Sequence, residues 1–203
     1  KPDINYIFGH ILHTKMSLSI WNDLTTDLED LTMKINKGQK VVGAFAMLGL
    51  IDDLQLQRKA AEIYTNDKFP ISDSLPKIGS YPKHKKIRIG YFSADFHNHA
   101  TMHLMAELFE YHDKSSFELI AFSFGPDQQD AWRKRVLLSF DDFIDVSLMS
   151  NEDVALLSRE MEIDIAIDLK GYTQDCRPGI FAKMAAPIQV SYLGYPGTMA
   201  VDY

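Results

Sequence analysis

Hydrophobic residues in the first third of the chain recur every three or four positions, as in residues 4–12 and 24–35. This spacing gathers apolar side chains on one side of a helix. A further helix is predicted to begin at Asp52 or Asp53, because either carboxylate can cap free backbone N–H groups. We therefore predict short antiparallel helices over residues 1–66, as at the end of a tetratricopeptide-like array.

Residues 67–86 have a different composition, with three prolines and three serines. Proline removes backbone donors and disfavours helix in the residue before it, so we predict an extended linker here. The linker ends in Lys83-His84-Lys85-Lys86, which we interpret as a solvated lead-in to a strand.

From residue 87 onward, apolar strands alternate with amphipathic helices. This alternation predicts an α/β fold over 87–203, a doubly wound and mostly parallel sheet of the Rossmann type. The cap of the helix that starts near residue 151 is expected to be Asn151. The predicted strands are 87–92, 117–124, 143–146, 163–169 and 188–193, and the predicted helices are 102–112, 130–139, 151–161 and 180–184.

Composition narrows the function classes further. The 203 residues carry 21 Lys and Arg against 28 Asp and Glu, a net charge of −7, which disfavours nucleic acid or an anionic membrane as a partner. The single cysteine, Cys176, cannot form an internal disulfide, and no apolar run reaches the ~18 residues that span a bilayer. We expect a cytoplasmic protein.

Three polar loops follow strands of the predicted sheet: 93–103, 170–177 and 193–198. Ligands of doubly wound sheets gather at the carboxyl ends of the strands, so we expect these loops to meet on one rim. The glycines of the third loop would let backbone amides approach a ligand closely.

Several common sites are disfavoured by the residues of these loops. Of His97, His99 and His103, only the last two have the i, i+4 spacing of helical metal ligands, and we expect no metal. The sequence has no Gly-x-Ser-x-Gly turn, so a serine hydrolase of that type is not expected. No Gly-x-Gly-x-x-Gly follows the first strand, so a dinucleotide site of the usual kind is not expected.

The same loops resemble a known family. The segments SADFHNHATMHLM (93–105), GYT (171–173) and APIQVSYLGYPGT (186–198) are similar to the protein O-GlcNAc transferase and SPINDLY family. The resemblance covers roughly residues 87–203, and the helical part before residue 68 resembles the segment that joins tetratricopeptide repeats to the catalytic region.

The resemblance implies inverting transfer of a sugar, GlcNAc from UDP-GlcNAc, to Ser or Thr hydroxyls of acceptor proteins, with the nucleotide sugar as donor and no other cofactor. Family members have two Rossmann-like lobes in the GT-B arrangement. We expect this chain to be the N-lobe, an incomplete portion that transfers no sugar without the second lobe.

Site residues are implied by the same motifs. His99 and Asp95 match the catalytic-loop histidine and carboxylate of the family. The substrate-binding residues would be Asn98, Thr101, His103, Tyr172, Thr173, Arg177, Leu193, Gly194, Tyr195, Pro196, Gly197 and Thr198.

Two departures from the family pattern favour a bacterial-type member. Residues 43–48 lack the histidine pair of animal members, and Gln174 stands where many members have lysine. Two alternatives remain open: a protein-binding adaptor with a degenerate transferase lobe, and a relative that uses GDP-fucose.

Overall fold

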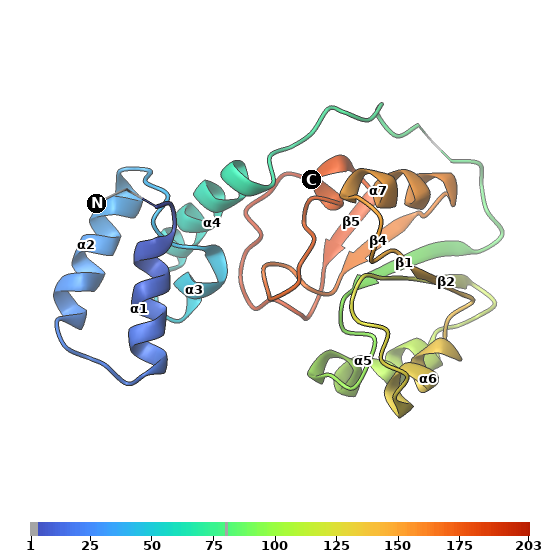
Figure 1. Ribbon diagram of the computed structural model, residues 1–203. Helices are drawn as coiled ribbons and strands as arrows, with labels where there is room; N and C mark the ends of the chain where they lie inside the picture. The colour runs from blue at the N-terminus through green and yellow to red at the C-terminus, as the bar shows by residue number, and fades with distance from the viewer. Residues whose placement is uncertain (1–3, 80) are drawn as a thin grey trace. The chain divides into compact units, whose positions relative to one another are not determined.

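The computed structural model describes residues 4–79 and 81–203 (Figure 1). The chain forms two compact units, one helical and one built on a sheet, and we describe each by itself. The boundaries predicted at residues 66 and 86 remain predictions. The helical unit runs to Pro70 and includes Pro196–Asp202, whereas the sheet unit comprises Ile71–Tyr195 and Tyr203.

Short helices build the helical unit around a small core that includes Leu12, Leu31 and Met47. Asp53, rather than Asp52, caps the last helix, because its carboxylate accepts the N–H groups of residues 55 and 56 at 2.9 Å. The helix at 44–48 was not predicted, since five residues give too short a periodic pattern. The helices are α1 (Ile7–Ser17), α2 (Leu24–Asn36), α3 (Ala44–Leu48) and α4 (Leu54–Lys68).

A five-stranded parallel sheet forms the centre of the other unit, with the order β3-β2-β1-β4-β5. This arrangement confirms the predicted α/β fold. The central strand β1 pairs with β2 on one side and with β4 on the other. The strands are β1 (Ile87–Ser93), β2 (Phe117–Ser123), β3 (Asp142–Asp145), β4 (Ile165–Asp168) and β5 (Ile188–Ser191).

Helices cover both faces of the sheet, as Figure 1 shows. Alternate strand residues point to opposite faces, so Tyr91 packs with the α5 and α6 layer. Phe92 and Phe122 belong to the other layer, where their rings stack with centroids 4.3 Å apart. The helices are α5 (Ala100–Tyr111), α6 (Ala131–Leu137), α7 (Asn151–Glu160) and the 3-10 helix η1 (Phe181–Lys183).

Three local predictions were wrong. Ser150, not Asn151, caps α7, because Ser150 and Asp153 form a reciprocal capping box. The predicted helix at 180–184 is a single 3-10 turn. The last strand ends at Ser191, and Leu193 already has a left-handed backbone with φ of 63°.

The lead-in to β1 is not simply solvated, which corrects the prediction for this stretch. The His84 side chain is only 12% exposed and contacts two carboxylates, Glu162 at 2.8 Å and Asp164 at 3.2 Å. The hydrogen bond to Glu162, and to a smaller extent the one to Asp164, raises the pKa of His84. None of the described helices is long and apolar enough to cross a membrane.

Candidate functional site

The carboxyl ends of β1 and β4 lie side by side at the centre of the sheet, where the chain connections diverge to opposite sides. Such a switch point leaves a crevice above the strand ends, and loops around it supply the ligand contacts in doubly wound folds. The loop that contains Asp95 follows β1, and the loop that contains Lys170 follows β4.

A buried ion pair joins these two loops. The ammonium Nζ of Lys170 lies 2.9 Å from Oδ1 and 2.7 Å from Oδ2 of Asp95. The side chains are 5% and 8% exposed, so water screens the pair little. The Asp95 carboxylate, which the motif assigned to the catalytic loop, is therefore buried beneath the surface.

His99 is the exposed member of this group. Its ring begins α5: Nδ1 accepts the backbone N–H of Thr101 at 3.2 Å, and it lies 3.5 Å from Asp95 Oδ2. The side chain is 42% exposed. His99 therefore combines a fixed inner edge at Nδ1 with an outer edge open to a ligand.

Thr101 connects the buried carboxylate to the exposed ring. Its hydroxyl lies 3.3 Å from Asp95 Oδ2 and 3.1 Å from His99 Nδ1. The residue is only 7% exposed, so its hydroxyl is engaged within the protein. The substrate contact that the sequence motif predicted for Thr101 remains a prediction.

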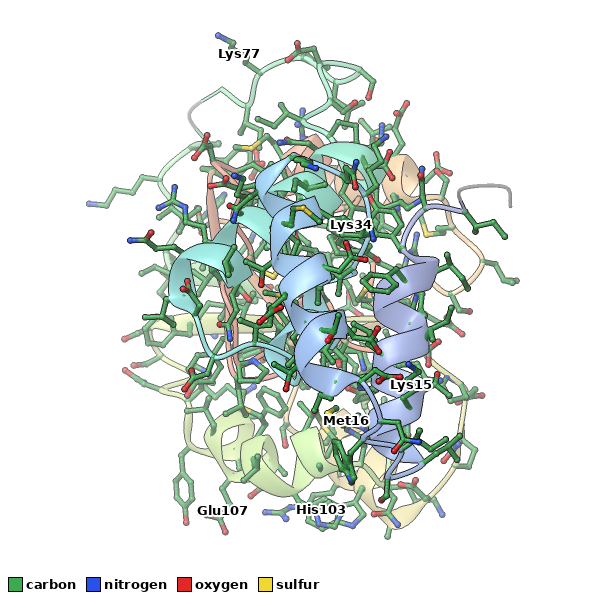
Figure 2. The ribbon with its side chains drawn as sticks, turned by 90° about the vertical axis from the view of Figure 1, so that its left-hand side faces the viewer. Lys15, Met16, Lys34, Lys77, His103 and Glu107 are labelled. Carbon is green, nitrogen blue, oxygen red and sulfur yellow. The ribbon has the colours of Figure 1, made fainter. Side chains whose placement is uncertain are left out.

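Asn98, on the same loop, and His103, near the start of α5, form a second, outer pair. His103 Nε2 lies 2.8 Å from Asn98 Oδ1, and its ring stacks on Trp132 with centroids 4.2 Å apart. Figure 2 shows His103 on the outer side of α5, beside Glu107. The Asn98 backbone N–H donates to Asp130 at 2.7 Å, and this bond helps to fix the loop.

Asp168, the last residue of β4, shapes the turn that presents Lys170. Its carboxylate accepts the backbone N–H of Lys170 at 2.8 Å and that of Gly171 at 3.1 Å. Burial raises the pKa of Asp168 to about 6, outweighing these two bonds, which favour the charged form. Gly171 has φ of +54°, and an added Cβ there would lie 2.3 Å from Cβ of Tyr195.

The loop after β5 meets the loop after β4. The Tyr192 N–H donates to the Asp168 carbonyl at 2.9 Å, and the Tyr172 and Tyr195 rings meet edge to face at 5.4 Å. A Cβ on Gly194 would lie 1.8 Å from the Leu169 carbonyl oxygen, so only glycine permits this approach. These contacts place residues 193–195 on the predicted rim.

Three of the predicted substrate-binding residues, Tyr172, Thr173 and Arg177, make contacts within the protein, and their binding roles remain predictions. Tyr172 is 5% exposed, and the Thr173 hydroxyl donates to the Lys170 carbonyl. Arg177 donates to Asn151 and to the carbonyls of Val146 and Met149, at 2.8 to 3.0 Å. Pro196, Gly197 and Thr198 belong to the helical unit, so their predicted substrate contacts remain predictions.

Sequence reasoning missed Lys170, Asp168 and Trp132 as members of the site. The available signal was weak but real: a lysine and an aspartate flank the end of an apolar strand, where charged residues are uncommon without partners. The three loop histidines do not converge, and within residues 4–79 and 81–203 no three His, Cys, Asp or Glu side chains gather as metal ligands would.

Known glycosyltransferases are similar to this chain in sequence. The chain is 41% identical over 119 residues to a probable UDP-N-acetylglucosamine–peptide N-acetylglucosaminyltransferase SEC of Arabidopsis thaliana, covering 59% of this chain and 12% of that protein. It is 36% identical over 120 residues to a UDP-N-acetylglucosamine–peptide N-acetylglucosaminyltransferase of Caenorhabditis elegans, covering 59% and 10%.

A solved O-GlcNAc transferase mutant of Thermobaculum terrenum superposes with a TM-score of 0.69 at 25% identity, over 78% of this chain and 32% of that one. The chain thus spans only a small part of the relatives that it matches. The model of glycosyl transferase family 41 matches residues 63–203, more than half of the sequence. The chain belongs to glycosyl transferase family 41.

Proposed function

We propose that this chain is part of an enzyme that transfers N-acetylglucosamine from UDP-GlcNAc to Ser or Thr hydroxyls of acceptor proteins, with inversion at the sugar. Family 41 membership over residues 63–203 supports the reaction class. The observation that carries the site is the exposed His99 ring, held at the switch point above the buried Asp95–Lys170 pair.

The reaction makes specific demands on the protein. The acceptor oxygen bonds to the anomeric carbon as the bond from that carbon to the diphosphate breaks. The acceptor hydroxyl must lose its proton, which an oxygen of the departing diphosphate can take, and that diphosphate must be stabilised by positive charge or N–H donors. The rim supplies an imidazole and the partly positive N-terminus of the twelve-residue helix α5.

His99 has the best position to contact the reacting groups. Because Nδ1 accepts the Thr101 N–H, a neutral ring carries its proton on Nε2 and can donate it to an oxygen of the sugar or diphosphate. Asp95 is buried, so we assign it the support of this ring and of the loop rather than direct contact with substrate.

The outer rim would border the sugar or the acceptor. Asn98 and His103 would contribute from the loop after β1 and the start of α5, and Leu193 and Gly194 from the loop after β5; Leu193 is 46% exposed. We keep Pro196, Gly197 and Thr198 as proposed substrate contacts on the strength of the sequence motif alone.

Further parts of the proposal rest on the family resemblance. We propose a second lobe that completes the diphosphate site, a tetratricopeptide-like array before the catalytic region, and no metal requirement. The single Cys176 agrees with a reducing compartment, the cytoplasm.

Titration of UDP-GlcNAc and of GDP-fucose into the full-length protein by calorimetry tests the proposal, together with transfer to acceptor peptides. We expect heat and sugar transfer with UDP-GlcNAc. Heat with GDP-fucose alone would indicate the fucosyl-transferring relative, and the absence of heat with either donor would favour the adaptor.

A further inference from the structure

We infer that Lys170 is a positioning residue for the proposed sugar transfer, one that fixes the orientation of the His99 imidazole through Asp95 and Thr101. This inference rests on the proposed function and adds to it a residue that none of the sequence motifs assigned to the site.

Burial sets Lys170 apart from the other ion-paired lysines of the described chain. The side chains of Lys15, Lys34, Lys40, Lys68, Lys114 and Lys183, which also pair with carboxylates, are 21–46% exposed. The Lys170 side chain is 5% exposed. Removing an ammonium from water this completely is unfavourable unless its partners compensate. Asp95 provides that compensation with both of its oxygens.

The contacts of Asp95 then transmit this constraint to His99. The Oδ2 atom held by Lys170 also faces the Thr101 hydroxyl at 3.3 Å and His99 Nδ1 at 3.5 Å. The Thr101 hydroxyl in turn lies 3.1 Å from Nδ1. Since the imidazole is a rigid ring, fixing the surroundings of Nδ1 also fixes the direction in which Nε2 meets a ligand.

Lysine suits this position because its ammonium is compact and carries three donors, two of which can reach the same carboxylate. Without the ammonium, the buried Asp95 carboxylate would have to find other donors nearby. The Thr101 hydroxyl and the His99 ring already lie 3.3 and 3.5 Å from its Oδ2. We therefore expect the loss of Lys170 to turn the ring away from its active orientation.

The first experiment needs no enzyme activity. The nitrogen shifts of the ¹⁵N-labelled His99 imidazole are measured by NMR in wild type, Lys170→Met, Lys170→Arg and Lys183→Met. Lys183 is the control, because its ion pair of 2.6 Å is with Glu152 and involves none of Asp95, Thr101 and His99. We expect Lys170→Met to move the His99 signals, Lys170→Arg to move them less, and Lys183→Met to leave them in place.

The second experiment measures transfer by the same variants in the full-length protein. Lys170→Met should lower kcat by about tenfold to a hundredfold, as misplacement of a reacting group does. The KM for the donor should stay within about twofold, because Lys170 does not touch it. Lys170→Arg should recover part of the loss, and Lys183→Met should keep the wild-type kcat.

Two results would overturn the inference, and they differ. If Lys170→Met leaves both the His99 signals and kcat unchanged while thermal stability falls, Lys170 is only structural and the proposed function stands. If the wild type transfers no sugar although the His99 signals respond to Lys170→Met, the proposed function fails, and with it the role of Lys170 in transfer. If Lys170→Met does not fold, Lys170→Gln, which keeps an N–H donor toward Asp95, is judged by the same two criteria.

Discussion

The Nδ1 atom of His99 accepts the backbone N–H of Thr101 at 3.2 Å, so an exposed ring of the candidate site is also the N-cap of α5. A single side chain thus supports the helix through one nitrogen and leaves the other for a ligand. Loss of activity on substitution would therefore be ambiguous unless the cap is preserved.

Two substitutions of His99 separate these roles. His99→Ala removes the cap and should lower the free energy of unfolding by about 1 kcal/mol. His99→Asn keeps a capping oxygen and should stay within about 0.5 kcal/mol of wild type. Both should lower sugar transfer by at least about a hundredfold, because neither supplies an imidazole. Urea denaturation and peptide glycosylation assays measure the two effects, and an active His99→Asn variant would remove His99 from the chemistry.

Asp168 gives the fold a pH dependence of defined sign. Burial raises its pKa to about 6 from an ordinary value of 3.8, so the folded protein binds its proton more tightly than the unfolded chain. The stabilisation is complete below about pH 4 and is lost as the pH rises through about 6.

Asp168→Asn should remove this dependence. Relative to the variant, the wild type should lose roughly 1–3 kcal/mol of stability between pH 4 and pH 7. The amide also changes the hydrogen bonds to Lys170 and Gly171, but that difference is independent of pH. Unfolding by urea at several pH values measures the effect, and parallel curves for the two proteins would contradict the assignment.

His84 produces a second pH effect at higher pH. Its contacts with Glu162 and Asp164 raise the pKa above 6.5, the value for an unperturbed histidine. Its contribution is therefore complete below pH 6.5 and is lost as the pH rises through the raised pKa. The urea midpoint should fall more between pH 6 and pH 9 in wild type than in His84→Gln. An equal fall in both proteins would show that the contacts of His84 with Glu162 and Asp164 do not contribute to stability.

Gly194 tests how closely the loops after β4 and β5 must approach. In Gly194→Ala the new Cβ would overlap the Leu169 carbonyl oxygen, which should lower the free energy of unfolding by about 1–3 kcal/mol. Gly79→Ala is the control, since nothing lies within 4 Å of its Cβ position, and it should change stability by less than about 0.5 kcal/mol. Thermal denaturation compares the two, and a fully stable Gly194→Ala would mean that this turn is free to move.

The sequence predicted the strands and most helices because their apolar periodicity is strong and local. The predictions were wrong where neighbouring residues compete for one role, such as the helix cap, or where the element is a single turn. Ser150 precedes Asn151 and has Asp153 three residues later, so the capping box forms one residue earlier than the predicted cap. The turn at η1 is likewise too short for periodicity to distinguish a 3-10 helix from an α-helix.

Within the candidate site, the motifs indicated the loops that follow β1, β4 and β5 but not the direction of each side chain. Thr101 lies in the segment 93–105 and Arg177 in the polar loop 170–177, yet each makes polar contacts within the protein. Lys170 escaped notice because its partner is 75 positions away in the sequence. A pairing of that kind becomes visible only when the sheet order is known.

The same separation has a consequence for how the protein is made. On the ribosome, β1, β2 and β3 emerge before β4, and a nascent chain that has reached Asp145 still lacks the ammonium that neutralises Asp95. Docking of β4 against β1 then brings Lys170 beside Asp95. Long-range parallel pairings form slowly, since a large loop must close first. Formation of the central β1–β4 pair and neutralisation of the Asp95 carboxylate therefore depend on the same long-range closure.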